Sequence, residues 1–254
     1  MDLNISPLVI TAFQAPSDPE RCAEFLREHR KVLEDFGITN VTTNEETWMH
    51  DPDTYVIVAE HPELGMVGGV RIQLAHADQP LPMVHAVGKL DPSVHTVLDR
   101  LAAEGKNAEL CGLWNAHRYV RRGLPLLLGY ASAALASQLG LRTMVCLIAH
   151  YTLHHALKVG FTVLDEVGDG GTFSYPIPSI KAIALYVPDV IGAEHITSIH
   201  RRRVLSLRLR PDQITEEAPM GKPMTVDYRL NLRLSAQEVD QYKGIIETRL
   251  RYSA

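Results

Sequence analysis

Cysteine is scarce in this sequence, and its placement excludes two kinds of site. The 254 residues include three cysteines, Cys22, Cys111 and Cys146, at wide spacings. An odd number without a CxxC pair predicts neither a disulfide framework nor a cysteine metal site. Two of the three lie in apolar runs, where a buried thiol behaves as a small hydrophobic side chain. We therefore expect a protein of the reducing cytoplasm.

Long hydrophobic runs and an excess of basic charge are also missing. No apolar run approaches the ~20 residues that span a bilayer, and the N-terminal residues do not resemble a signal peptide. The formal net charge is -5, from 25 basic and 30 acidic residues, which argues against a nucleic-acid partner. With 46% hydrophobic and 22% charged residues, the composition is that of a globular protein of one large domain, or one domain plus an appendage.

Hydrophobic periodicity predicts helices interspersed with strands up to about residue 190. Asp18, Pro19 and Glu20 form a helix start, and His29 falls among the apolar positions of that helix. A proline and glycine turn joins two strands into an antiparallel hairpin, with Arg71 on the face opposite the apolar set. The predicted helices cover 19–36, 92–104, 123–139 and 152–159, and the predicted strands cover 54–59, 66–74, 108–114, 143–149, 161–164 and 181–187.

The pattern changes beyond Pro188. Leu205, Leu207 and Leu209 alternate with polar residues, as do the apolar positions of 224–232, which is typical of strands with one apolar face. Residues 211–223 are polar and loop-like, and a capping box at 235–238 predicts a last helix. We interpret 1–190 as the main domain and 191–254 as a β-hairpin and helix extension, which could bury its leucine faces against a second chain in a homodimer.

A basic loop containing glycine precedes the most apolar predicted helix. Free amides at a helix N-terminus, the helix dipole and nearby arginines together form an anion site, which would suit a pyrophosphate or a phosphopantetheine phosphate. The alternative is that Gly123 only starts the helix and the arginines are solvated. The residues concerned are Arg118, Arg121, Arg122, Gly123 and Leu124.

The order of elements around this loop resembles that of GNAT acyltransferases. In that family a fourth strand leads into the loop Arg/Gln-x-x-Gly-x-Gly/Ala, and a later short helix ends in Gly-Phe, as at Gly160 and Phe161 here. Val120 and Pro125 depart from the loop pattern. The resemblance implies an α/β fold with a mixed, mostly antiparallel sheet flanked by helices and an acyl-CoA co-substrate. It also implies that the splayed backbone of Leu113, Trp114 and Asn115 holds the pantetheine arm, with the basic loop on the phosphates.

A narrower resemblance links the chain to acyl-homoserine-lactone synthases and the related N-acyl amino acid synthases. It is carried by acidic positions, a hairpin ending in arginine, a Pro-Met pair and a strand that starts with glutamate but has Cys-Gly in place of Ser-Arg. It implies a bacterial N-acyltransferase that takes an acyl chain, possibly long, from CoA or acyl carrier protein to a small amine such as an amino acid. The residues are Asp51, Asp53, Arg71, Pro82, Met83 and Glu109 to Leu113, with Arg71, Phe173 and Tyr175 as substrate-binding candidates.

Acyl transfer to an amine needs a group that removes the amine proton, and Glu109 is the candidate base. The alternative for Glu109 is a salt bridge, perhaps to Arg71. Leu157 stands near the position of the usual GNAT tyrosine, so Tyr151 or His150 is the candidate that protonates the leaving thiolate.

Several other readings stay open. The i and i+4 spacing of His150 and His154 would also permit zinc, but we expect no metal because no further ligand is evident. An acetyltransferase using acetyl-CoA and a non-catalytic binding or assembly module are the alternative functions.

Overall fold

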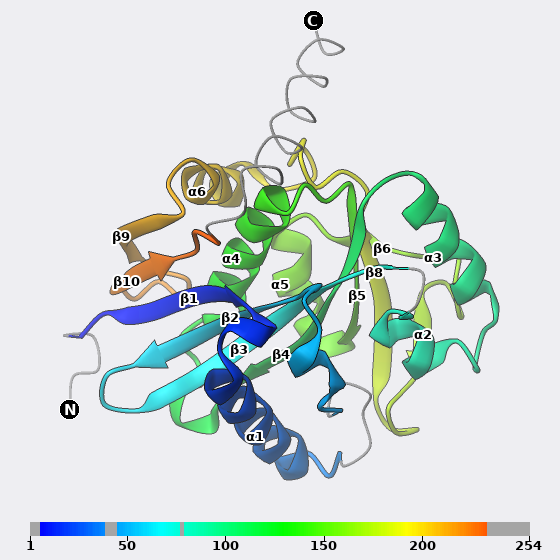
Figure 1. Cartoon of the computed structure of the whole chain (residues 1–254), viewed down its shortest axis with the longest axis horizontal. Coiled ribbons are helices and arrows are strands. Elements are labelled where there is room, and N and C mark those ends of the chain that lie inside the picture. The colour runs from blue at the N-terminus through cyan, green and yellow to red at the C-terminus, as the bar shows by residue number, and fades with distance from the viewer. Residues whose placement is uncertain (1–5, 39–44, 77–78, 233–254) are drawn as a thin grey trace, which may run out of the picture.

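A mixed sheet forms the centre of the computed structural model, which describes residues 6–38, 45–76 and 79–232 (Figure 1). Within these ranges it has ten strands, in the order β6-β8-β5-β4-β3-β2-β1-β10-β9, with β7 paired to β8. Two pairings, β4 with β5 and β1 with β10, are parallel, and the others are antiparallel. The strands are β1 Leu8–Gln14, β2 Thr54–His61, β3 Gly65–Leu74, β4 Asn107–Asn115, β5 Thr143–Ala149, β6 Thr162–Val163, β7 Thr172–Ser174, β8 Lys181–Val187, β9 Asp212–Glu217 and β10 Met224–Arg229. The mixed, mostly antiparallel sheet expected from the sequence is confirmed.

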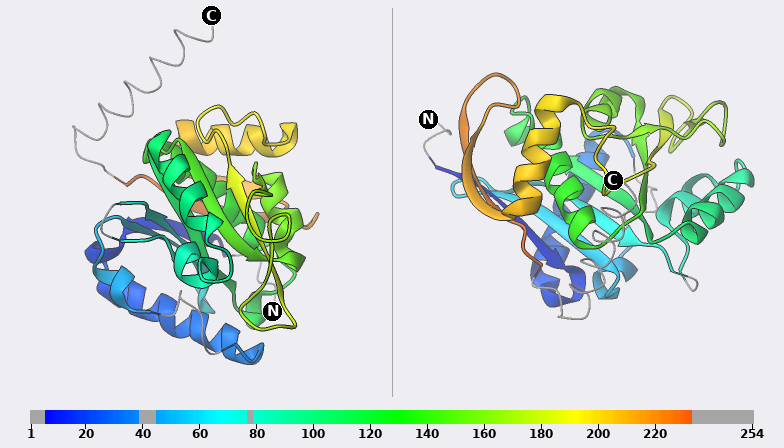
Figure 2. Two further views of the ribbon diagram at one scale, coloured as in Figure 1. Left: turned by 90° about the vertical axis from the view of Figure 1, so that its right-hand side faces the viewer. Right: turned by 90° about the horizontal axis from the view of Figure 1, so that it is seen from above.

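Helices cover both faces of this sheet (Figure 2). One face packs against α1, α2 and α3, and the other against α4, α5 and α6. None of the helices in the described ranges is long and apolar enough to cross a membrane. Their bounds are α1 Pro19–Asp35, α2 Pro82–Val87, α3 Ser93–Ala103, α4 Leu124–Gln138, α5 Leu153–Lys158 and α6 Ser198–Leu209, with 3₁₀ turns at Thr47–His50, His117–Tyr119 and His150–Thr152.

The helix signals in the sequence account for α1 and α4. The Asp18 side chain accepts a 3.0 Å hydrogen bond from the Arg21 amide and caps α1, whose buried face includes Phe25 and His29. Helix α4 is buried almost all round because the sheet lies on one side of it and α5 and α6 on the other. The predicted strands that became β2 to β5 and β8 are confirmed to within a few residues.

Part of the prediction for the C-terminal extension was wrong. Residues 205–209 are not a strand but belong to α6, in which Val204 and Leu207 are buried while Leu205 and Leu209 are exposed. Three leucines at spacing two cannot distinguish a strand from a helix over so short a stretch, and packing against α4 decides the outcome. The polar segment 211–223, expected to be a loop, contains β9, and β7 and α2 were not predicted. The last predicted helix, from residue 235, lies outside the described residues.

The hairpin of the extension is therefore β9 with β10. Strand β10 pairs in parallel with β1, with Leu8 opposite Val226, so the hairpin continues the central sheet. Helix α6 is fastened to the core by Arg208, which donates hydrogen bonds to the carbonyls of Val190 and Ile191. A separate unit from 191 to 254 stays a prediction.

Candidate functional site

The central sheet splits between β4 and β5. The two strands pair only from Asn107 opposite Thr143 to Glu109 opposite Val145, although both run on for several residues. A bulge in β4 follows at once, because Arg71 of β3 lies opposite Cys111 and the next paired positions are shifted. Gly112 in the bulge has φ +62°, a backbone conformation that suits glycine. The strands therefore diverge and leave a gap in the sheet.

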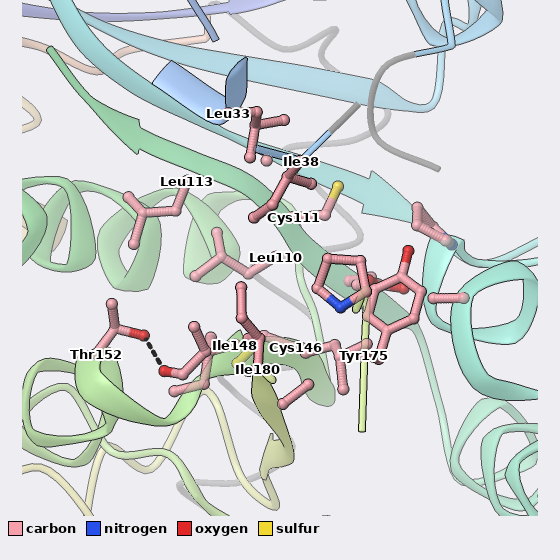
Figure 3. A pocket seen from close by; sticks show the side chains of 18 of the residues that line it. Leu33, Ile38, Leu110, Cys111, Leu113, Cys146, Ile148, Thr152, Tyr175 and Ile180 are labelled. Carbon is pink, nitrogen blue, oxygen red and sulfur yellow. Dashed lines mark hydrogen bonds between the residues drawn. The ribbon is translucent and has the colours of Figure 1, made fainter. Parts of the chain in front are cut away.

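A pocket of about 220 Å³ fills this gap. Figure 3 shows Leu110 and Leu113 of β4 facing it, with Ile148 and Ile180 across the gap and Leu33 at the α1 end. Its lining is mostly apolar, and the remaining lining residues include a few polar side chains. These polar side chains are His29, Glu109, Tyr151, Thr152 and Tyr175. An apolar cleft with few polar groups is the usual form of a site for a small molecule.

Glu109 is the acidic group of the pocket. Its side chain is buried, and Oε2 accepts a 2.7 Å hydrogen bond from the backbone amide of Met83 at the start of α2. Burial raises the pKa of the Glu109 carboxyl to about 8, while the Met83 amide and the charge of Arg71 act in the opposite direction. A carboxyl with a pKa near the working pH can both accept and release a proton.

Arg71 lies behind the pocket lining rather than in it. It is 1% exposed, and its guanidinium carbon lies 4.2 Å from the centre of the Trp48 ring. It donates a hydrogen bond to the Cys111 thiol, and its charge acts on both Cys111 and Glu109. A salt bridge between Arg71 and Glu109, the alternative role of Glu109, stays a prediction. Arg71 acts on Glu109 as a nearby positive charge that favours the ionised carboxylate.

Tyr151 and His150 lie in the 3₁₀ turn that follows β5. Tyr151 lines the pocket and is 54% exposed, so the residue lies at the mouth of the cleft. His150 is exposed and packs edge-on against Tyr151, with ring centres 5.5 Å apart, but does not line the pocket. Leu157 is an exposed residue of α5 and offers no acid. Tyr151 is therefore the better placed of the two candidates.

The arginines of the basic loop after β4 make different contacts. Arg118 turns back to the β2–β3 hairpin, where it donates to the carbonyls of Leu64 and Met66 and pairs with Glu28 at 2.9 Å. Arg122 lies over the ring of Tyr119, with the guanidinium carbon 5.1 Å from its centre. Both arginines thus have contacts within the protein.

The start of α4 is partly covered by the turn between β9 and β10. Gly123, with φ +73°, immediately precedes the helix, and a Cβ atom built on it would lie only 2.5 Å from Cβ of Pro219. Leu124 is buried and packs on Gly68 of β3. Binding of the donor phosphates by Arg118, Arg121, Arg122, Gly123 and Leu124 stays a prediction.

The remaining predicted residues divide between the pocket and the core. Leu113 and Tyr175 line the pocket. Trp114 points to the α1 side, with its ring centre 5.8 Å from that of Phe25, and Phe173 is buried in the core under α2 and α3. Trp114 could thus reach a pantetheine arm only through its main chain, as the resemblance implied. Binding of the arm by Asn115 and direct substrate contact by Phe173 stay predictions.

An acidic cluster lies near the ends of β2 and β3. Asp51, Asp53 and His76 bring one possible ligand atom each within 4.8 Å of one another. The two oxygens of Asp51, however, accept hydrogen bonds from the Asp53 amide and the Thr54 hydroxyl. These bonds give Asp51 a structural role, because they hold the turn that leads into β2. The absence of a metal stays a prediction.

Sequence reasoning missed the α1 side of the pocket. His29 and Leu33 are one helical turn apart on α1, and Ile38 follows the helix. The available signal was a histidine among the apolar positions of the first helix. The Met83 amide was missed because α2, at six residues, is too short for its periodicity to be recognised.

Neither a protein-family model nor a curated protein matches this chain, but solved structures share its fold. The N-acyl amino acid synthase FeeM from uncultured soil microbes is 20% identical with a TM-score of 0.54, over 72% of this chain and 97% of FeeM. The CoA-dependent acyl-homoserine lactone synthase BjaI, solved with SAM and isopentyl-CoA, is 16% identical with a TM-score of 0.53, over 93% of this chain and 99% of BjaI. The chain therefore shares the mixed α/β fold of these two synthases, which is the fold that its sequence predicted.

Proposed function

We propose that this protein is an N-acyltransferase that moves an acyl group from a thioester to the amine of a small molecule such as an amino acid. The observation that carries the proposal is the position of Glu109, whose buried carboxyl faces an apolar pocket in the gap between β4 and β5. The activities of FeeM, an N-acyl amino acid synthase, and BjaI, a CoA-dependent acyl-homoserine lactone synthase, support the same class of reaction.

The divergent part of β4 would bind the donor. Beyond Glu109, the edge of β4 that faces β5 is released from strand pairing, so its amides and carbonyls can bond a pantetheine arm. The acyl chain would lie among Leu110, Leu113 and Ile148. A pocket of about 220 Å³ offers more space than an acetyl group needs. The donor carrier is CoA or acyl carrier protein.

The chemical step follows from the position of Glu109. The amine nitrogen attacks the thioester carbonyl carbon, a C–N bond forms, and Glu109 takes the amine proton directly or through one water. The C–S bond then breaks, and the electron pair leaves on the thiolate. Tyr151 at the pocket mouth would give the thiolate its proton. The products are an amide and a free thiol.

Two further parts of the proposal concern context. We propose that the protein works in the cytoplasm, since Cys22, Cys111 and Cys146 are free and buried. The exposed side chains of Leu205 and Leu209, which are one helical turn apart on α6, form an apolar pair that would suit a homodimer.

Thiol release with acetyl-, octanoyl- and palmitoyl-CoA, each with a panel of amines, tests the proposed function. The amide product should appear by mass spectrometry in proportion to the thiol released, and both should require the amine. Thioester binding is measured separately by thermal shift. Absence of both turnover and thioester binding would rule the enzyme out.

One observation favours a second candidate, a binding module without turnover. The turn that carries Pro219 packs on Gly123, at the helix start where GNAT enzymes hold the donor phosphates. If this contact persists in solution, acyl-CoA would bind weakly or only through its acyl end. Thioester binding without any amide product would support this second candidate.

A further inference from the structure

The pocket has a second wall, formed on the α1 side of β4. It consists of His29, Leu33, Ile38 and Cys111, which we call the α1 wall. The acyl chain is proposed to bind at the split in the sheet, between Leu110 and Leu113 of β4 and Ile148 of β5. The α1 wall is therefore free to receive the other reactant.

His29 is the polar member of the α1 wall. Its side chain is 3% exposed, and Nδ1 has no hydrogen-bond partner among the residues that the structure describes. Burial, assisted by the positive charge of Arg71, lowers the pKa of His29 to about 3. The imidazole is therefore neutral at physiological pH, with one nitrogen that donates and one that accepts. A buried polar atom without a partner calls for an explanation, and for an atom in a pocket wall a polar group of the ligand would supply one.

Arg71 adds a positive charge behind the same wall. Its charge acts on His29, Cys111 and Glu109, which all line the pocket. Gly112 lines the pocket between them, and a Cβ atom there would lie 3.3 Å from Nε of Arg71. The absence of a side chain at Gly112 keeps the guanidinium close to the pocket. Such a field favours an anionic group at the α1 wall and disfavours a cationic one.

From this arrangement we infer that the α1 wall binds the acceptor as an amine that carries a carboxylate and an apolar side chain, with His29 as the residue that positions the carboxylate. The inference rests on the proposed function. Leu33 and Ile38 would contact the apolar side chain, an N–H of His29 would donate to the carboxylate, and Glu109 would receive the amine proton. The acceptor class is then a hydrophobic amino acid.

The test compares acceptors that differ in one group. L-phenylalanine, L-phenylalaninamide and phenethylamine share the amine and the ring, but only the first has a carboxylate. With octanoyl-CoA as donor, kcat/KM for L-phenylalanine should exceed that for either analogue roughly tenfold or more. The analogues lack the carboxylate, so they lose its hydrogen bond to His29 and its attraction to the charge of Arg71. Equal use of all three by the native protein would overturn the inference, whether or not any variant folds.

Variants of His29 then assign the effect to that residue. His29→Phe should raise KM for L-phenylalanine roughly tenfold, and the preference in kcat/KM for L-phenylalanine over phenethylamine should fall by a similar factor. His29→Gln retains an N–H donor and should recover part of the affinity, whereas a purely structural role would lower unfolding temperature and all rates together. An unchanged KM for L-phenylalanine in folded His29→Phe would contradict the role of His29. If the native protein neither bound a thioester nor formed any amide product, the proposed function itself would be refuted.

Discussion

The backbone amide of Met83 donates a 2.7 Å hydrogen bond to Oε2 of Glu109, and this bond joins α2 to the floor of the β4–β5 gap. It fixes the carboxyl of a residue that is otherwise surrounded by apolar groups and thiols. The amide stabilises the ionised form, and burial stabilises the neutral form more strongly, which accounts for a pKa of about 8.

Replacement of Glu109 by Gln should lower kcat/KM for acyl transfer about 100-fold or more, because the side chain keeps its shape and the Met83 bond but cannot take a proton. In the native protein, initial rates measured between pH 6 and 9.5 should rise with pH and level off above the Glu109 pKa of about 8. This rise should be absent in Glu109→Gln. Glu166→Gln, at an exposed ion pair with Arg100, is the matched control and should keep native rates. Native activity in Glu109→Gln would move Glu109 to a structural role.

The same carboxyl should make stability depend on pH. Its pKa is about 8 in the folded protein against an ordinary value of 4.5, so the folded state keeps a proton that the unfolded state has released. The stabilisation from this group is complete below about pH 4.5 and is lost as the pH rises towards 8. Thermal unfolding at several pH values should show a steeper decline over this interval in the native protein than in Glu109→Gln. Parallel curves would show that Glu109 ionises normally.

The sequence was sufficient for the fold and for part of the site. Clear caps, such as Asp18, and apolar strands, such as 143–149, have strong local signals, and they place Glu109 and Tyr151 on neighbouring elements. The α1 wall and the Met83 amide depend on contacts between segments far apart in the chain, which periodicity does not encode. The contacts of Arg118 could not be predicted for a related reason, since a solvated, a phosphate-binding and a structural arginine have the same local sequence, and its role in donor binding stays a prediction.

Tyr151 and His150 can be separated by substitution. If Tyr151 protonates the leaving thiolate, Tyr151→Phe should lower kcat about tenfold to 100-fold, with little change in KM for the amine. His150→Gln should remain near the native rate because His150 lies outside the pocket. A better leaving group removes the need for a proton, so an acyl thioester of an acidic aryl thiol should restore turnover in Tyr151→Phe. Failure of that substrate to restore the rate would contradict the role of Tyr151.

Two arginines of the basic loop should behave differently. Arg118→Ala removes the bonds to Leu64 and Met66 and the Glu28 pair, and should lower the unfolding temperature by a few degrees with KM for acyl-CoA unchanged. Arg121→Ala should leave stability intact and raise KM for acyl-CoA several-fold, more at low salt, if the loop holds phosphates. Acyl-pantetheine lacks the nucleotide phosphates and is the control substrate. The same KM change with acyl-pantetheine would exclude phosphate binding by Arg121.

The packing of Pro219 on Gly123 predicts coupling between the C-terminal hairpin and α4. Gly123→Ala should destabilise the fold by roughly 2 kcal/mol, because alanine is strained at φ +73° and its Cβ meets Pro219. Pro219→Gly removes the opposing Cβ, so the double variant should be more stable than the sum of the single effects predicts, by roughly 0.5–1 kcal/mol. Chemical denaturation of the four proteins measures this difference. Strictly additive effects would mean that the turn does not rest on the start of α4 in solution, and the helix end would then be open to a donor phosphate.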